Sequence, residues 1–565
     1  MGRLLNILKN INSIISIFFI IYIVFLYKIY PKIKNKKNLL NILAFIPLII
    51  GIIHFLVFNF HKAISTTFMY FNPLYTMALL IPVWVLTINK VGLKKNILLL
   101  LICCGVISYF EVTGNLIMNE NLHNLSYENY TKSFTKTLKL MEKEYVLNDH
   151  KKIDYEYLYN KYYPNIKKSE EQKNEQLYLK TMFEFSKEFK DGHVFLGFPN
   201  TKEPPSEKLK FLNDYQNRDY GFITILLDNN KFMAFNVDKK SDAYKKGLRD
   251  GMYILKKNGI SLDKILENVI TPLNSYPVKR VEDQMKSLYL FATGNEEIEI
   301  TYQNNQKEQT IKIKSMGNKN TRMNKLRDKI FLNHSNYKNL ETKMLNENTG
   351  YLYIATEMNY PLRGSIAYVL DDSSYLTKKL DKKLKELRNK GMKNLILDLR
   401  SNSGGYSTES KAIAALFVDD KKLISKFKRY DGKIYDKQYL KGIGKYKDIN
   451  VTILVNSETV SAGDEILYML QNKPNIKIIG ITPSKNSCQS PGGKIYLANG
   501  TSFLKYPTYG IFDKNDKVFI DTDNSGKETI KLSEKISLTK ENIFAIYKDD
   551  DYLLNYCLKK RVNES

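Results

Sequence analysis

Short apolar runs alternate with helix-like segments beyond residue 345, and this alternation is the strongest constraint on the fold. The strand-like runs, each bounded by turn residues, are 350–355, 394–399, 451–455 and 476–481. The segments with the apolar spacing of a helix are 375–388, 409–417 and 462–471. Strands that alternate with helices build a sheet covered by helices, with functional residues at the carboxyl ends of the strands. We therefore expect an α/β core in this part of the chain.

Two of the expected strand ends carry residues suited to acyl-transfer chemistry. After 394–399 the chain reaches Gly404 and Gly405, and paired glycines let backbone N–H groups approach a ligand closely, as an oxyanion site requires. After 451–455, Ser461 and Ala462 open a helix whose dipole and N–H groups can stabilise developing negative charge. Taken alone, this second run is more simply a helix cap, because an acidic residue follows the serine three positions later.

A third motif favours the catalytic interpretation of Ser461 over the helix cap. The loop 484–489 follows the strand 476–481 and contains Lys485 and Gln489. The set resembles the C-terminal processing peptidases, or tail-specific proteases. That family has Asp-Leu-Arg-x-Asn-x-Gly-Gly, then Asn-x-x-x-x-Ser-Ala-x-Glu, then Gly-Lys-Gly-x-x-Gln. The corresponding segments here are 398–405, 456–464 and 484–489, and the resemblance covers roughly 130–510.

The resemblance implies a serine endopeptidase that hydrolyses peptide bonds in unfolded or extended protein segments. Ser461 would be the nucleophile, Lys485 its general base and Gln489 the residue that orients Lys485. Ala462 and either Gly404 or Gly405 would supply the oxyanion N–H donors. A lysine acts as a base only when burial lowers its pKa from about 10.4 towards neutrality, so Lys485 must lie buried near Ser461.

Departures from the family pattern keep two alternatives open. Asp464 stands where the family has Glu, and Ser484 and Asn486 replace the glycines beside the lysine. One alternative is therefore a catalytically inactive relative that binds or senses peptides. The other is a Ser-His hydrolase, because the superfamily includes members with a His base and His193 follows Asp191-Gly192 here.

The region before the core divides into helical and β-rich parts. Residues 131–190 carry apolar stripes typical of helices, and 220–316 reads as short strands with turns. The order of helix, Gly-Leu step and acid-Gly turn at 241–255 resembles a PDZ domain, which binds a peptide end by strand addition. The resemblance places the carboxylate-capturing loop at Tyr220-Gly221-Phe222-Ile223, although an ordinary strand start explains these residues equally well.

Four apolar stretches open the chain, and each approaches the roughly 20 residues needed to cross a bilayer. They are 11–30, 39–59, 68–89 and 96–114, although a cleaved signal peptide at 1–30 is an alternative for the first. Lysines gather in the loops after the first and third stretches, which predicts that these loops are cytoplasmic. We therefore expect a multi-pass protein of the cell membrane whose catalytic region is extracytoplasmic.

The predicted fold class is accordingly multi-domain, with four transmembrane helices before an α+β and α/β region. That region would hold a helical arm, a PDZ-like β domain and an α/β core with a crotonase-like sheet. The predicted boundaries are 1–114 for the membrane segment, 115–205 for the arm, 206–318 for the PDZ-like domain and 319–565 for the peptidase core and tail.

Composition limits the cofactors and partners. Four cysteines exclude a disulfide scaffold, and no His, Cys or carboxylate group has metal-ligand spacing. No Gly-rich phosphate loop follows a strand correctly, so we predict no metal and no other cofactor. The net charge of +27 is scattered, without a basic block, which argues against nucleic acid as a partner. The expected partner is a polypeptide with a free C-terminus, and a homo-oligomer or a partner in the membrane stays open.

Overall fold

The computed structural model describes most of the chain beyond residue 120 and part of its N-terminal region. The described residues are 18–19, 21–26, 28–29, 32, 35–54, 81, 121–198, 209–273, 275–304, 307–332, 339–358, 372, 374–489 and 492–564.

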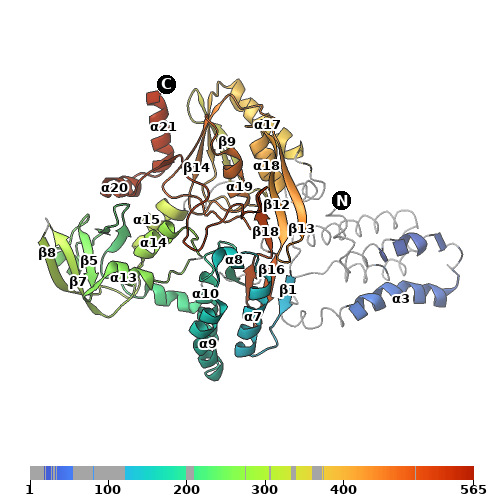
Figure 1. The fold of residues 1–565 in the computed structure, drawn as a ribbon, viewed down its shortest axis with the longest axis horizontal. Helices are drawn as coiled ribbons and strands as arrows, with labels where there is room; N and C mark the ends of the chain where they lie inside the picture. The colour runs from blue at the N-terminus through green and yellow to red at the C-terminus, as the bar shows by residue number, and fades with distance from the viewer. Residues whose placement is uncertain are drawn as a thin grey trace.

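A six-stranded sheet forms the centre of the molecule (Figure 1). Its strand order is β19-β15-β14-β11-β10-β9; the neighbours from β19 to β10 run parallel, and β9 is antiparallel to β10. The strands are β9 (Leu340–Met344), β10 (Thr349–Ile354), β11 (Asn394–Asp398), β14 (Asn450–Val455), β15 (Ile476–Gly480) and β19 (Glu534–Lys535). The predicted α/β core is confirmed.

Both faces of this sheet are buried, which explains why its strands are apolar without alternation. On β11, Leu395 and Leu397 join one hydrophobic cluster with the helices that follow the strands, whereas Ile396 joins a second cluster on the opposite face. The helices of the first face are α17 (Ser374–Asn389), α18 (Ser407–Ala415) and α19 (Ala462–Leu470).

A second sheet, in the order β3-β4-β5-β7-β8, occupies the region predicted to be PDZ-like. Helix α14 lies along the free edge of β3, where the Ser287 hydroxyl accepts a hydrogen bond from the N–H of Leu226 at 2.8 Å. The strands of this second sheet are β3 (Ile223–Leu226), β4 (Phe232–Phe235), β5 (Tyr253–Lys257), β6 (Ile260–Ser261, paired with β5), β7 (Glu297–Asn304) and β8 (Lys307–Lys314). Its helices are α12 (Asp242–Lys245), α13 (Leu262–Glu267) and α14 (Lys279–Ser287).

Helices occupy the region predicted to be a helical arm, and they pack against the first of two small sheets. These have the orders β1-β16-β17-β2 and β13-β12-β18. The helices are α7 (Tyr130–Glu144), α8 (Asn148–Lys151), α9 (Tyr155–Glu171), α10 (Glu175–Lys187) and the 3-10 helix η2 (Lys210–Gln216). The strands are β1 (Asn121–Asn124), β2 (Phe195–Gly197), β12 (Lys421–Arg429), β13 (Ile434–Lys441), β16 (Gly493–Tyr496), β17 (Phe503–Tyr506) and β18 (Tyr509–Phe512).

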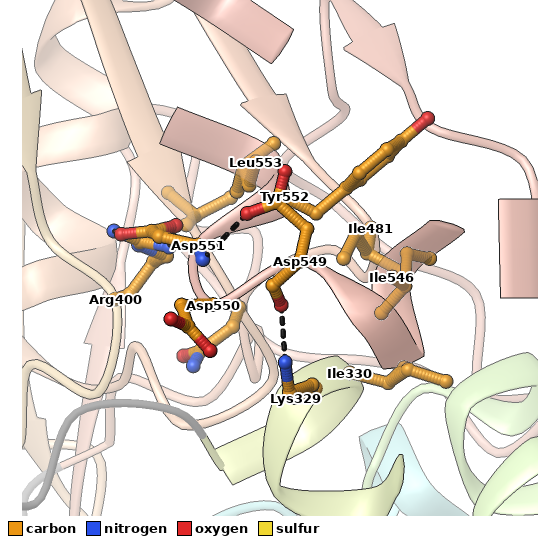
Figure 2. Close-up of a pocket in the computed structure, with 12 residues that line it drawn as sticks. Lys329, Ile330, Arg400, Ile481, Ile546, Asp549, Asp550, Asp551, Tyr552 and Leu553 are labelled. Atoms are coloured by element: carbon orange, nitrogen blue, oxygen red, sulfur yellow. Dashed lines mark hydrogen bonds and ion pairs between the residues drawn. The ribbon is translucent and has the colours of Figure 1, made fainter. Parts of the chain in front are cut away.

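The C-terminal segment joins the second sheet to the core. Phe544 of α20 (Lys540–Lys548) stacks edge-on against Phe235 of β4, and Asp551 pairs with Arg400 at 2.6 Å after the end of β11. Figure 2 shows the small pocket at this junction, where Arg400 and Lys329 face the segment that leads into α21 (Tyr552–Glu564). The helical turn η3 (Asp328–Leu332) contributes Lys329 and Ile330 to its lining, and α15 (Met323–Arg327) directly precedes η3.

The prediction of four membrane helices is wrong. Within the described ranges, no helix is both long and apolar enough to span a bilayer. Helix α3 (Lys37–His54) has polar ends and contains Pro47, and its stretch without a polar side chain runs only from 42 to 53. At 1.5 Å per residue this is roughly 18 Å, against about 30 Å of hydrocarbon. The stretches 68–89 and 96–114 lie outside the described residues except for Ile81. The predicted multi-pass location and the extracytoplasmic placement of the catalytic region depended on four crossings, so these predictions are wrong as well.

Candidate active site

Ser461 occupies a strained position at the start of α19. Its backbone has φ 61° and ψ −119°, in the positive-φ region that a residue with a Cβ rarely adopts. Its hydroxyl makes no capping hydrogen bond, so the simple helix-cap interpretation does not hold. The N–H of Ser461 donates to the carbonyl oxygen of Ser487 at 2.9 Å, which fixes the turn to the loop that carries Lys485.

The Gly-Gly loop lies directly against Ser461. A Cβ added to Gly404, where φ is +78°, would stand 2.6 Å from the Ser461 Cβ and 3.1 Å from the Ala462 nitrogen. The N–H of Gly404 is used, because it donates to Asn402 Oδ1 at 2.9 Å. The N–H groups of Gly405 and Ala462 have no acceptor among the described residues. These two are the donors that could receive an oxyanion.

Lys485 is buried beside the same loop. Its backbone N–H donates to the carbonyl of Thr459 at 2.8 Å, and its side chain is only 9% exposed. The aliphatic stem covers Gly192, where an added Cβ would lie 2.9 Å from the Lys485 Cδ. The ammonium group is 3.4 Å from Glu458 Oε2, so it is ion-paired in this state.

Gln489 bonds to backbone groups of the segment 511–520. Its Oε1 accepts a hydrogen bond from the N–H of Ile511 in β18 at 2.6 Å, and its Nε2 donates to the carbonyl of Ile520 at 3.4 Å. Both ends of the amide are therefore engaged by backbone groups. In this state the Gln489 side chain joins the loop to β18, and its role as the residue that orients Lys485 stays a prediction.

His193 belongs to a buried polar cluster behind the two loops. Its Nδ1 lies 3.0 Å from the Ser487 hydroxyl, which in turn lies 3.2 Å from Asp191 Oδ1. Burial, reinforced by the positive charge of Lys485, lowers the pKa of His193 to about 4 despite the nearby Asp191 carboxylate. The imidazole is neutral at pH 7, and a group with this pKa is a weak general base there.

Two buried carboxyl groups hold the loops that surround Ser461. Burial raises the pKa of Glu357 to about 8, and its Oε1 accepts a hydrogen bond from Asn402 Nδ2 at 2.8 Å. Because Asn402 Oδ1 holds the N–H of Gly404, Glu357 fixes the Gly-Gly loop through one intermediate side chain. Burial also raises the pKa of Asp464 to about 7, although the N–H of Ser487 donates to its Oδ2 at 3.0 Å.

The segment predicted to capture a peptide carboxylate is closed in the structure. Tyr220, Phe222 and Ile223 are all buried, and the N–H of Gly221 already donates to Asp219 Oδ1 at 2.7 Å. Capture of a peptide end at these residues stays a prediction.

Sequence reasoning missed three residues of the site. Ser487 connects Ser461 with His193, Glu458 pairs with Lys485, and the Tyr276 hydroxyl donates a hydrogen bond to Glu458 Oε1 at 3.0 Å. Ser487 and Glu458 lie inside the motif segments 484–489 and 456–464, so their position was a usable signal. Tyr276 had none, since it stands 182 residues before Glu458 in the chain.

Comparison with known proteins separates the core from the rest of the chain. Residues 349–524 match peptidase family S41. This S41 region contains the Gly-Gly loop, Ser461 and Lys485, so the resemblance inferred from the motifs is confirmed at the level of the family match. The second sheet and α7 to α10 lie outside it, and the PDZ-like assignment stays a prediction.

Individual relatives of the S41 region are distant. A probable CtpA-like serine protease of Staphylococcus aureus (strain N315) is 24% identical over 253 residues, which are 45% of this chain and 41% of that protein. The carboxy-terminal processing protease CtpA of Bacillus subtilis (strain 168) is 28% identical over 155 residues, 27% of this chain and 32% of that protein. The chain thus spans less than half the length of these curated relatives. The structure of mature CPAF complexed with lactacystin aligns with 78% of this chain and 99% of that chain, at 10% identity and a TM-score of 0.47.

Proposed function

We propose that this protein is a serine endopeptidase of the C-terminal processing type, acting on unfolded or extended polypeptides. The observation that carries the proposal is the geometry at Ser461. A strained serine opens a helix, the Gly404 Cα lies against it, and no described residue accepts a hydrogen bond from the N–H groups of Gly405 and Ala462. Such donors stabilise the negative charge of a tetrahedral intermediate.

In the proposed reaction the Ser461 hydroxyl attacks the scissile carbonyl and forms an acyl-enzyme. Neutral Lys485 takes the hydroxyl proton, and water later hydrolyses the ester. Lys485 is the better candidate base, because His193 bonds to Ser487 and its pKa is about 4.

The test uses the full chain and an unstructured polypeptide with an apolar free C-terminus. We expect cleavage by the natural protein, loss of cleavage in Ser461→Ala, and normal cleavage in Ser374→Ala. Ser374 is the matched control, an exposed serine that begins a different helix, α17. A fluorophosphonate probe, followed by peptide mass mapping, should label Ser461 alone. Cleavage that survives Ser461→Ala would contradict the proposal.

A catalytically inactive peptide-binding relative is the second candidate. The engagement of Gln489 by Ile511 and Ile520, and of Lys485 by Glu458, favours it, because neither side chain serves Ser461 in this state. The absence of fluorophosphonate labelling together with retained binding of the same polypeptide would support this candidate over the peptidase.

A further inference from the structure

Three segments far apart in the chain meet at the Lys485 ammonium. Its Nζ lies 3.4 Å from Glu458 Oε2 and 5.5 Å from the centre of the Tyr276 ring. The Tyr276 hydroxyl donates to the other oxygen of Glu458 at 3.0 Å. Lys485 comes from the loop after β15, Glu458 from the loop before α19, and Tyr276 from the segment between α13 and α14. We call these three residues the lysine clamp.

The clamp opposes the chemistry proposed for Lys485. An amine that forms an ion pair with a carboxylate is held in its charged form, and a charged amine cannot accept the proton of a serine. The pair is partly shielded from water, since the side chains of Lys485 and Glu458 are 9% and 29% exposed. Shielded pairs are stronger than surface pairs, and losing one partner leaves the other charge uncompensated.

Tyr276 connects the clamp to the second sheet. Its side chain is buried, and burial together with Glu458 holds the pKa of its hydroxyl well above the usual value, so the hydroxyl remains a donor. Tyr276 stands three residues before α14, whose Ser287 is bonded to β3 at Leu226. The short segment 276–278 therefore links the clamp to α14 and, through α14, to the second sheet.

We propose that Glu458, positioned by Tyr276, holds Lys485 as a resting ammonium, so that the site stays latent until the clamp opens. When it opens, Nζ gives its proton to water, and the neutral amine can then accept the proton of Ser461. Glu458 and Tyr276 are positioning residues that act through Lys485. The inference rests on the proposed function and adds the regulation of the same site.

The activity test compares Glu458→Gln and Tyr276→Phe in the full chain. Glu458→Gln should raise kcat/KM at pH 6.5 about tenfold and move the acid limb of the pH profile about one unit lower, since one unit is a factor of ten. Tyr276→Phe should give a smaller change in the same direction. Tyr289→Phe is the matched control, because Tyr289 is also a buried tyrosine of this region but bonds weakly to Arg327, at 3.5 Å. A lower kcat/KM with an unmoved acid limb in Glu458→Gln would overturn the proposal.

A stability cycle tests the clamp without relying on catalysis. Glu458→Gln, Lys485→Met and the double variant are unfolded in urea. The midpoint shift of the double variant should be clearly smaller than the sum of the single shifts, because the second change removes a partner that is already lost. Additive shifts would overturn the clamp. If the shifts are non-additive but the fluorophosphonate probe never labels Ser461, the lysine clamp exists and the proposed peptidase activity is rejected.

Discussion

The Gly-Gly loop and the loop that carries Lys485 both contact Ser461 or its backbone, but their polar groups are used differently. Beside the nucleophile, Glu357 and Asn402 hold the Gly-Gly loop, and the N–H groups of Gly405 and Ala462 have no acceptor in the part of the chain that the structure describes. On the base side, the Lys485 ammonium and the Gln489 amide are both engaged by other groups. The N–H donors that would stabilise negative charge are in place. The side chains that would take up and orient the proton, Lys485 and Gln489, are instead held by other groups.

This difference matters because the two sets of groups carry different costs. Preorganised N–H donors need no rearrangement at the moment of reaction, which is the source of their catalytic value. A lysine base, in contrast, must lose a proton before it can work. A site whose base is held in an ion pair can therefore be kept silent without dismantling the oxyanion donors.

The largest expected effect comes from filling the contact between Gly404 and Ser461. Gly404→Ala would place a Cβ 2.6 Å from the Ser461 Cβ and 2.9 Å from the carbonyl oxygen of Val460. The loop must shift, and the loss of aligned N–H donors should lower kcat by about 10²- to 10³-fold. Steady-state cleavage of the unstructured polypeptide measures this effect.

Gly432→Ala separates backbone strain from contact with the nucleophile. Gly432 has φ +79°, nearly the value of Gly404, but nothing lies within 4 Å of its added Cβ. Both variants introduce the strain of a non-glycine residue at positive φ, of order 1 kcal/mol. Only Gly404→Ala also adds a contact with Ser461. Equal loss of activity in the two variants would show that strain, and not the oxyanion loop, is responsible.

The parts that sequence patterns predicted are those in which local composition decides the structure. The run 394–399 is apolar because both faces of its strand are buried, and Gly404 is a glycine because φ is +78° against a neighbouring Cβ. The membrane prediction failed on polar residues and Pro47, which shorten the apolar part of α3. Hydropathy over a long window hides such interruptions.

The contacts that sequence patterns could not predict join distant segments. Tyr276 stands in a short segment without periodicity, and it reaches Glu458 from a hydrophobic cluster that it shares with Phe331 and Ile481. The motif 484–489 placed Lys485 in the loop correctly, but the direction of a long, flexible side chain depends on its neighbours. Helices α20 and α21 were missed because their residues are mixed polar and apolar, and their few apolar side chains are buried only in a cluster shared with distant residues such as Phe235.

A smaller effect is expected on the base side from Gly192→Ala. The added Cβ would lie 2.9 Å from the Lys485 Cδ and 3.0 Å from the Ser487 Cβ, and a flexible lysine stem can move to make room. We expect kcat to fall about tenfold, because small misplacement of a reacting group is costly even when the fold survives. Gly317→Ala is the control, since nothing lies within 4 Å of its added Cβ. An unchanged kcat in Gly192→Ala would mean that the Lys485 stem need not cover Gly192.

The smallest expected effect is on stability, and it tests whether the Glu357 carboxyl that holds the Gly-Gly loop is protonated in the folded protein. Burial raises the pKa of Glu357 to about 8 in the folded protein, against about 4.3 for an unfolded glutamate. Between these values the folded state keeps a proton that the unfolded state has released. The contribution of Glu357 to stability is therefore complete below pH 4 and is lost as pH rises towards 8.

Carboxyl groups of two helices face Glu357 and titrate in the same direction. Glu409 of α18 and Asp464 and Glu465 of α19 all have raised pKa values, because of burial. Their contributions persist in Glu357→Gln, so the variant should lose less stability than the natural protein from pH 6.5 to 7.5, by about 1 kcal/mol. Urea unfolding at the two pH values measures the difference, with the exposed Glu308→Gln as control. If Glu357→Gln lost stability as steeply as the natural protein, Glu357 would already be ionised in the fold, and the Asn402 contact would join the Gly-Gly loop to a buried charge.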